Sequence, residues 1–263
     1  MRHPGVLLVV ALTGAAFACT EVGTDPDVPV AIEIEPPILP AIAAGDSLRD
    51  TLGAVATLVA RALNSRNEVI ADAPIRFFAL QSDTTAIIEV DSTTGQVAGL
   101  RVGDEDVIAR IAGLQSVRLP LRVTLAPDTA FAVSPLEDTV LYGLADDTAR
   151  ALAVTVAQRT IVDGRDTVLA VPFWRARYTI TTPPGLAENA DTTDVYIAND
   201  ANRPSRVDTT DASGIVRRRI RFPLAVVSDT LLRTFVTEVV VLRPDGTPLP
   251  GSPFLFTTVI RPR

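Results

Sequence analysis

The stretch from Ala86 to Gly113 constrains the fold most strongly, because short apolar–polar alternations follow one another with turn residues between them. Ile88 and Val90 alternate with polar neighbours, which is the period of a half-buried strand. The segment Asp91–Gly95 has turn chemistry, since Asp bonds its own backbone and Gly supplies positive φ. After a predicted turn at Gly103-Asp104 the alternation resumes at Val107, Ala109 and Ile111. Such closely spaced short strands predict an all-β sandwich.

This stretch and the residues before it resemble the group 2 bacterial immunoglobulin-like (Ig-like) domain, which occurs in adhesins of the invasin and intimin type. The matching residues are Leu58-Val59-Ala60, the polar turn Asn64–Asn67, Ile75-Arg76-Phe77 with Phe where the family tends to have Trp, Val90-Asp91, Gly95, Gly103 and Val107-Ile108-Ala109. The resemblance covers residues 28–124 and implies an Ig-like sandwich. It specifies a fold and hardly a function, because this sandwich carries many unrelated roles.

The N-terminal 19 residues predict an export signal. Arg2 precedes an apolar run, Val6–Ala18, that is shorter than the roughly 20 residues needed to span a bilayer. The sequence Ala16-Phe17-Ala18-Cys19 resembles a bacterial lipobox, which implies cleavage after residue 18, lipidation of Cys19 and anchoring to the membrane. The alternative is an ordinary signal peptide with an accidental cysteine. By the same resemblance, Thr20 after the cysteine implies the outer membrane, and residues 19–27 form an acidic tether.

Residues 125–263 predict a second Ig-like sandwich in tandem with the first. Val117, Leu119, Leu121 and Val123 close the first sandwich, and Phe131 with Val133 opens the second. Trp174, Ala176, Tyr178 and Ile180 alternate with polar residues, which is the clearest two-faced strand in the chain. The turn Thr210–Gly214 resembles one in invasin-type group 1 Ig-like domains. The fold class is therefore all-β, with a cleaved signal peptide at residues 1–18.

The residue inventory restricts the chemistry. The chain of 263 residues has one histidine, His3, one cysteine, Cys19, no lysine and a net charge of −7. After signal cleavage and lipidation no histidine or free thiol remains, which excludes Ser-His-Asp and Cys-His catalysis and histidine-bound zinc. The charge argues against nucleic-acid binding. We expect no enzyme and no cofactor.

Carboxylate clusters are the only remaining candidates for a metal site or for catalysis. They are Asp104-Glu105-Asp106, Asp146-Asp147, Asp191/Asp194 and Asp208/Asp211. All fall in predicted turns, where Asp is expected for backbone reasons. Solvated turns and calcium ligation both fit these residues, and we assign no metal site.

Two arginine runs could contact anionic polymers. Arg217, Arg219 and Arg221 share one face of a predicted strand, and Arg175 with Arg177 makes a second run. The first run fits either phosphate or uronate groups of a polymer or a solvated face paired with acidic neighbours. For Trp174 two interpretations are open: a buried residue of the sandwich core, or an exposed aromatic surface on which a sugar ring stacks.

The composition and the resemblances favour a non-catalytic, lipid-anchored module of the bacterial cell envelope that acts in spacing, adhesion or assembly. Its partners would be the membrane through Cys19 and an envelope protein or surface polysaccharide. The alternative is a surface lipoprotein that binds or cleaves carbohydrate with its carboxylates.

Overall fold

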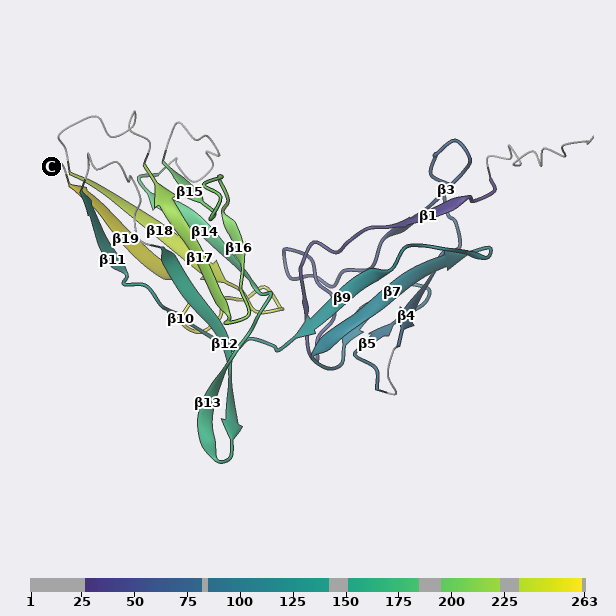
Figure 1. The fold of residues 1–263 in the computed structure, drawn as a ribbon, viewed down its shortest axis with the longest axis horizontal. Helices are drawn as coiled ribbons and strands as arrows, with labels where there is room; N and C mark the ends of the chain where they lie inside the picture. The colour runs from purple at the N-terminus through teal and green to yellow at the C-terminus, as the bar shows by residue number, and fades with distance from the viewer. Residues whose placement is uncertain (1–26, 82–84, 142–150, 185–194, 223–231, 262–263) are drawn as a thin grey trace, which may run out of the picture.

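The computed structural model describes residues 27–81, 85–141, 151–184, 195–222 and 232–261, and every regular element within these ranges is a β-strand. The apolar residues form two separate cores. One lies between Ile32 and Val123, and the other between Ala130 and Ile260. We call the two units the N-terminal and the C-terminal sandwich (Figure 1). The signal peptide, Cys19 and nearly all of the tether lie outside the described residues, as do Asp146-Asp147 and Asp191/Asp194.

Nine strands make up the part of the N-terminal sandwich that the structure describes. They are β1 (Ala31–Ile34), β2 (Ile42–Ala43), β3 (Ala60–Leu63), β4 (Arg76–Leu80), β5 (Ile88–Val90), β6 (Val97–Gly99), β7 (Gly103–Ile111), β8 (Leu114–Gln115) and β9 (Leu119–Thr124). One sheet has the order β2-β9-β7-β4, with β8 on β7. The opposite layer contains the pairs β1-β3 and β5-β6, which are joined where the Leu58 amide donates to the Gly95 carbonyl (2.8 Å).

The described residues of the C-terminal sandwich form ten strands. They are β10 (Thr129–Ala132), β11 (Glu137–Leu141), β12 (Leu152–Val162), β13 (Arg165–Ala170), β14 (Arg175–Thr182), β15 (Tyr196–Ala198), β16 (Val207–Thr209), β17 (Ile215–Arg221), β18 (Arg233–Val241) and β19 (Phe254–Arg261). One sheet has the order β10-β12-β17-β15, and the other β11-β19-β18-β14-β16.

Both sandwiches share one topological feature. An early strand pairs in parallel with the last strand: β2 with β9 in the first sandwich, and β11 with β19 in the second. The other pairs of named strands in the described residues are antiparallel. The two sandwiches thus repeat one strand plan, with seven or more antiparallel strands in two layers as in Ig-like domains.

The predicted alternation accounts for most of the core. Leu119, Leu121 and Val123 are buried in the first sandwich, and Ala176, Tyr178 and Ile180 in the second. The turn at residues 91–95 also forms as predicted, because the Asp91 carboxylate accepts the backbone amides of Thr93 and Thr94, both at 2.8 Å. The all-β sandwich prediction is confirmed. The predicted domain bounds, 28–124 and 125–263, stay a prediction.

Three local predictions are wrong. Gly103-Asp104 does not turn, because both residues belong to β7. Val117 lies before β9 and is 75% exposed. In β10 the buried residues are Thr129 and Ala130, and Phe131 is 45% exposed, so the strand presents to the core the residues that precede the predicted pair.

The hairpin of β12 and β13 extends beyond the sandwich and was not predicted from the sequence (Figure 1). Its two-residue turn, Asp163-Gly164, has φ values of 52° and 74°, the geometry favoured by an Asp-Gly pair between strands. Ile161 and Val168 on this hairpin are 71% and 51% exposed. The side chains of this projecting part therefore contribute little to the core, whereas Leu152, Val154 and Val156 at the start of β12 belong to it.

Candidate functional site at the junction of the two sandwiches

A pocket of about 410 Å³ lies between the two sandwiches. The N-terminal sandwich contributes residues 39–43, which end in β2, and the loop at residues 46–53. The C-terminal sandwich contributes the start of β14, part of β16, and the end of β18 with the turn after it. Domain junctions are common positions for ligand pockets, and this volume lies in the range of small-ligand sites.

Strand alternation positions the floor of this pocket. Ala176 and Tyr178 of β14 point into the core, so Arg175 and Arg177 point to the outer face of the same sheet. Arg177 pairs in register with Val240 of β18 and with Val207 of β16, which place apolar side chains beside it. The second arginine run of the sequence therefore lines the pocket.

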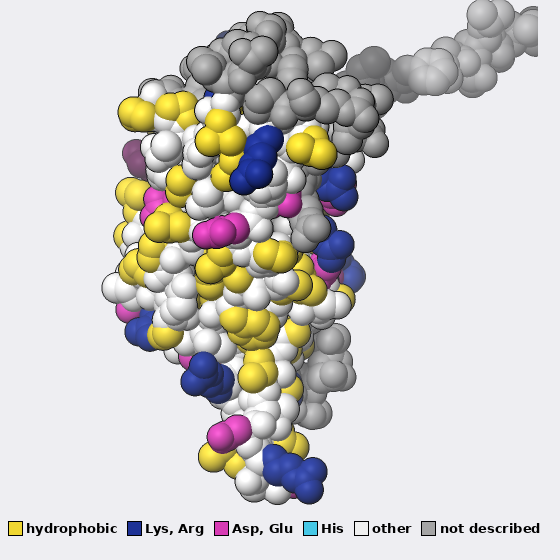
Figure 2. All heavy atoms as spheres, turned by 90° about the vertical axis from the view of Figure 1, so that its left-hand side faces the viewer, with side chains coloured by type: hydrophobic (Ala, Val, Ile, Leu, Met, Phe, Trp, Pro, Cys, Tyr) yellow, Lys and Arg dark blue, Asp and Glu magenta, His cyan; other side chains and the backbone are white. Residues whose placement is uncertain are grey.

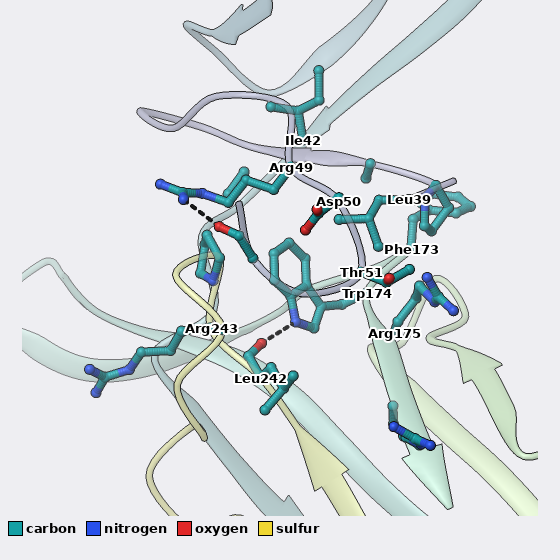
Figure 3. Close-up of a pocket in the computed structure, with 18 of the residues that line it drawn as sticks. Leu39, Ile42, Arg49, Asp50, Thr51, Phe173, Trp174, Arg175, Leu242 and Arg243 are labelled. Atoms are coloured by element: carbon teal, nitrogen blue, oxygen red, sulfur yellow. Dashed lines mark hydrogen bonds between the residues drawn. The ribbon is translucent and has the colours of Figure 1, made fainter. Parts of the chain in front are cut away.

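Trp174 lies at the centre of the pocket rather than in the core. It precedes β14, is partly buried, packs against the core from outside, and its indole Nε1 donates to the Leu242 carbonyl (2.9 Å; Figure 3). The residue before it, Phe173, has a φ of 61°, a left-handed conformation that is unusual for an aromatic residue. Trp174 is thus only partly buried, at the edge of the core, where the alternation of β14 predicted a buried residue.

Phe173 also connects the two sandwiches. The guanidinium of Arg122, on β9, lies 4.0 Å from the centroid of its ring. Thr124 at the end of β9 donates its hydroxyl to the Pro172 carbonyl (3.0 Å). Gly53 and Gly246 approach so closely that a Cβ on Gly53 would lie 2.8 Å from the Gly246 nitrogen. The junction is thus made of specific contacts.

The carboxylates of the pocket are already bonded within their own loop. Asp46 accepts two hydrogen bonds from Arg49, each at 2.7 Å. Burial alone would raise the pKa of Asp46, but the bonds from Arg49 and from the Ser47 amide outweigh it and hold the pKa below its ordinary value. Asp50 accepts the backbone amides of Leu52 and Ala54 through one oxygen.

The predicted carboxylate clusters do not converge into a site. Asp104 and Asp106 lie in β7 and pair with Arg122 and Arg118, at 2.5 Å and 3.5 Å, while Glu105 between them is buried and accepts the amides of Ile87 and Ile88. These three residues therefore lie in a strand, and the prediction that they form a turn is wrong. Within the described ranges no group of three acidic, histidine or cysteine side chains is arranged to hold a metal ion.

The other acidic pair is also committed to the backbone. Asp208 accepts the Arg217 amide and pairs with Arg218 at 2.7 Å. Asp211 accepts the amides of Ser213 and Ile215 and pairs with Arg217 at 3.1 Å. Both carboxylates hold the chain around β16 and β17 in place.

The structure places Arg217, Arg219 and Arg221 on the outer face of β17, while Val216 and Ile220 alternate into the core. Their side of the sheet is distinct from the floor of the junction pocket, which belongs to the other sheet. Binding of a polyanion by these three residues stays a prediction.

Strand order, register and the two parallel pairs define the class: an all-β protein made of two tandem Ig-like sandwiches. The part of the chain that the structure describes contains no helix long and apolar enough to cross a membrane.

No protein-family model and no curated protein matches the chain. Among solved structures the chain is similar to domains 4 and 5 of the S-layer protein SbsC, with 12% identity and a TM-score of 0.32 over 89% of this chain and 98% of that one. It is similar to the Yersinia pseudotuberculosis adhesin InvE, with 13% identity and a TM-score of 0.33 over 88% of this chain and 58% of that one. The D00-D0 domain of intimin matches with 10% identity and a TM-score of 0.26, over 86% of this chain and 98% of that one. The fold assignment itself rests on the strand order and register given above.

Proposed function

We propose that the protein is a non-catalytic, lipid-anchored module of the bacterial cell envelope, held at the outer membrane through Cys19 and acting as a spacer or adhesion module. The observation that carries the proposal is the arrangement of the two sandwiches in tandem, with the first and last described residues at opposite ends of the long axis (Figure 1). Such an arrangement holds the C-terminal sandwich away from whatever anchors the N-terminal end.

The residue inventory supports a role without catalysis. Beyond Cys19 the chain has no histidine, lysine or cysteine, so any hydrolysis would depend on carboxylates. The described carboxylates at the junction are all engaged: Asp46 by Arg49, Asp50 by backbone amides, and Asp245 by the amide and hydroxyl of Thr247. A pair of carboxylates free to act as acid and base is therefore absent from the described part of this pocket.

The surface supports contact with other envelope components. Apolar side chains are mixed with arginines and carboxylates on the face of the C-terminal sandwich shown in Figure 2, and no block of one charge sign covers that face. The exposed apolar side chains of this sandwich include Phe131, Leu136, Leu141 and Leu255. We propose that these exposed side chains take part in contacts with envelope components.

Membrane fractionation tests the proposal. The Cys19→Ser variant of the full chain should move from the membrane fraction to the soluble fraction, because a residue without a thiol cannot accept the diacylglycerol. Thr20→Ser, the matched control at the next position, should stay with the membrane. A Cys19→Ser protein that remains membrane-bound after a salt wash would contradict lipid anchoring at this residue.

The polyanion contact on β17 is a separate part of the proposal. Binding of an anionic surface polymer should weaken between low and physiological salt, because the Debye length falls to about 8–10 Å and charges farther apart are screened. Changing Arg217, Arg219 and Arg221 to Gln should remove it. Unchanged binding would place the contact elsewhere on the protein.

The second candidate function is carbohydrate binding without cleavage, and the position of Trp174 in the junction pocket favours it. Incubation of the purified protein with envelope glycans tests this distinction. Binding that leaves the glycan uncleaved supports carbohydrate binding. Cleavage of the glycan that is lost when an acidic pair is changed would instead indicate an enzymatic function.

A further inference from the structure

We propose that the junction pocket binds a carboxylate-bearing oligosaccharide, with a sugar ring against Trp174 and its acidic groups on the surrounding arginines. This inference rests on the second candidate function, carbohydrate binding, and goes beyond it because it names the class of carbohydrate that the junction pocket binds. It is also independent of the arginine face on β17.

The charge of the pocket favours an anionic ligand. Five arginines line it, namely Arg49, Arg175, Arg177, Arg206 and Arg243, against two carboxylates, Asp46 and Asp50. Only Arg49 forms an ion pair there, with Asp46. Within the described residues the other four have no carboxylate within salt-bridge distance, whereas Arg61, Arg118 and Arg122 elsewhere each have one.

One of the four arginines has an unused hydrogen-bond donor. The Nη2 atom of Arg206 is buried and has no acceptor among the described residues. A buried donor without an acceptor is costly, and a carboxylate is the acceptor whose shape best matches a guanidinium, since it accepts two parallel hydrogen bonds. A ligand carboxylate would reach this donor only if the Arg206 side chain moved, because the atom is closed to solvent in this structure.

The apolar part of the lining favours a sugar over a small anion. Phe173, Trp174, Leu39, Ile42, Val207 and Val240 all contribute to the pocket. The indole of Trp174 is fixed by its bond to the Leu242 carbonyl, so a rigid aromatic surface is available without further ordering. An inorganic anion would use the arginines and leave this surface unfilled, whereas a sugar ring would cover it.

The placement of the arginines favours an oligomer over a single sugar. Figure 3 shows Arg175 and Arg243 on opposite sides of Trp174. A ligand whose ring lies on the indole would therefore need acidic groups in both directions to reach both guanidiniums. Oligomers of uronic acids carry a carboxylate on every ring and meet this requirement.

The single tryptophan of the chain gives a readout that is specific to the pocket. Trp174 is the only tryptophan in the sequence, so a ligand that covers it must change the protein's tryptophan emission. The experiment titrates the purified full chain with oligogalacturonate, oligoglucuronate and alginate oligomers. Maltooligosaccharide of the same length provides the neutral sugar, and inorganic phosphate the anion without a sugar. We expect saturable emission changes with one or more of the uronates only.

Paired variants assign the contact to individual residues. Arg175→Gln with Arg177→Gln, and separately Arg243→Gln, should weaken uronate binding about tenfold or more, the loss expected when a charge-assisted hydrogen bond is removed. The double variant Arg159→Gln with Arg165→Gln removes the same charge from exposed positions on the hairpin of β12 and β13 and should leave the titration unchanged. Circular dichroism confirms that each variant is folded.

Three outcomes would overturn the proposal: no response to any uronate, an equal response to phosphate, or equal affinity in the folded pocket variants. None of these outcomes bears on lipid anchoring, which the Cys19→Ser fractionation tests by itself.

Discussion

The guanidinium of Arg122 lies 4.0 Å from the ring centroid of Phe173 and joins the last strand of the N-terminal sandwich to the loop before β14. Asp104 holds the guanidinium in place through two hydrogen bonds, at 2.5 Å and 3.0 Å. Phe173 presents its ring from a left-handed backbone conformation. A side chain fixed in one sandwich thus contacts a ring fixed in the other, which orients the two units.

Removing this cation–π contact should loosen the junction. Arg122→Gln should lower the free energy of unfolding by about 0.5–2 kcal/mol, the range for contacts between a cation and an aromatic ring. Urea unfolding measures the change. Arg118→Gln is the matched control, because Arg118 pairs with Asp106 at 3.5 Å, is 70% exposed, and has no ring contact of this kind among the described residues. Equal effects of the two variants would contradict a junction role for Arg122.

The approach of Gly53 to Gly246 should tolerate no side chain. A Cβ on Gly53 would lie 2.8–2.9 Å from backbone atoms of Asp245 and Gly246, and the φ of Gly53 is 87°. Gly53→Ala should therefore add a steric displacement of the junction to the conformational cost of about 1–2 kcal/mol for a left-handed residue. Gly113→Ala carries the same conformational cost with no atom within 4 Å. Thermal unfolding of Gly53→Ala and Gly113→Ala measures both variants, and the difference between their melting temperatures reports the junction contact. Equal losses of melting temperature would show that this contact does not stabilise the protein.

The sequence was sufficient to predict the fold class because strand alternation records which face is buried, as at Ala176, Tyr178 and Ile180. It was not sufficient to predict the junction pocket. Arg175 and Arg177 were recognised as sharing a face, but what covers that face is a loop more than 100 residues earlier in the chain. Such a contact depends on the docking of two folded units and leaves no local periodicity.

Two errors have local causes. Trp174 fits the alternation of β14, but it lies just before the strand and is only partly buried, because it also lines the junction pocket. The carboxylates Asp104–Asp106 have the composition of a turn, yet they lie in β7 because Arg122 and Arg118 neutralise the outer two. The buried Glu105 instead caps two backbone amides.

Phe77 should carry a large share of the stability of the N-terminal sandwich. It is buried at the position where the resembling family tends to have Trp, and Phe77→Ala should cost about 3–5 kcal/mol. Phe78→Ala, on the opposite face of the same strand, is the control, because Phe78 is 39% exposed. Urea unfolding measures both, and a loss below about 1 kcal/mol for Phe77→Ala would exclude the core position.

The Asp46–Arg49 pair should make stability depend on pH. The pKa of Asp46 in the folded protein lies below its ordinary value of 3.8. The contribution of Asp46 to the free energy of unfolding is therefore complete above pH 3.8 and is lost as the pH falls through the lowered pKa of the folded protein. Asp46→Asn should flatten the decline of the melting temperature in this acidic range. Arg49→Gln should do the same, since it removes the hydrogen bonds that lower the pKa. An unchanged decline in both variants would contradict this assignment.

Measuring the relative orientation of the two sandwiches tests the central claim most directly, because both the spacer role and the junction pocket require this orientation to be fixed. Spin labels at Ser65→Cys and Asp200→Cys, exposed positions in the two sandwiches, allow the distance between them to be measured by pulsed electron paramagnetic resonance. In a Cys19→Ser background these are the only two cysteines. We predict one narrow distance distribution that broadens in Arg122→Gln and Gly53→Ala. A broad distribution in the parent protein, unchanged by either substitution, would contradict the account.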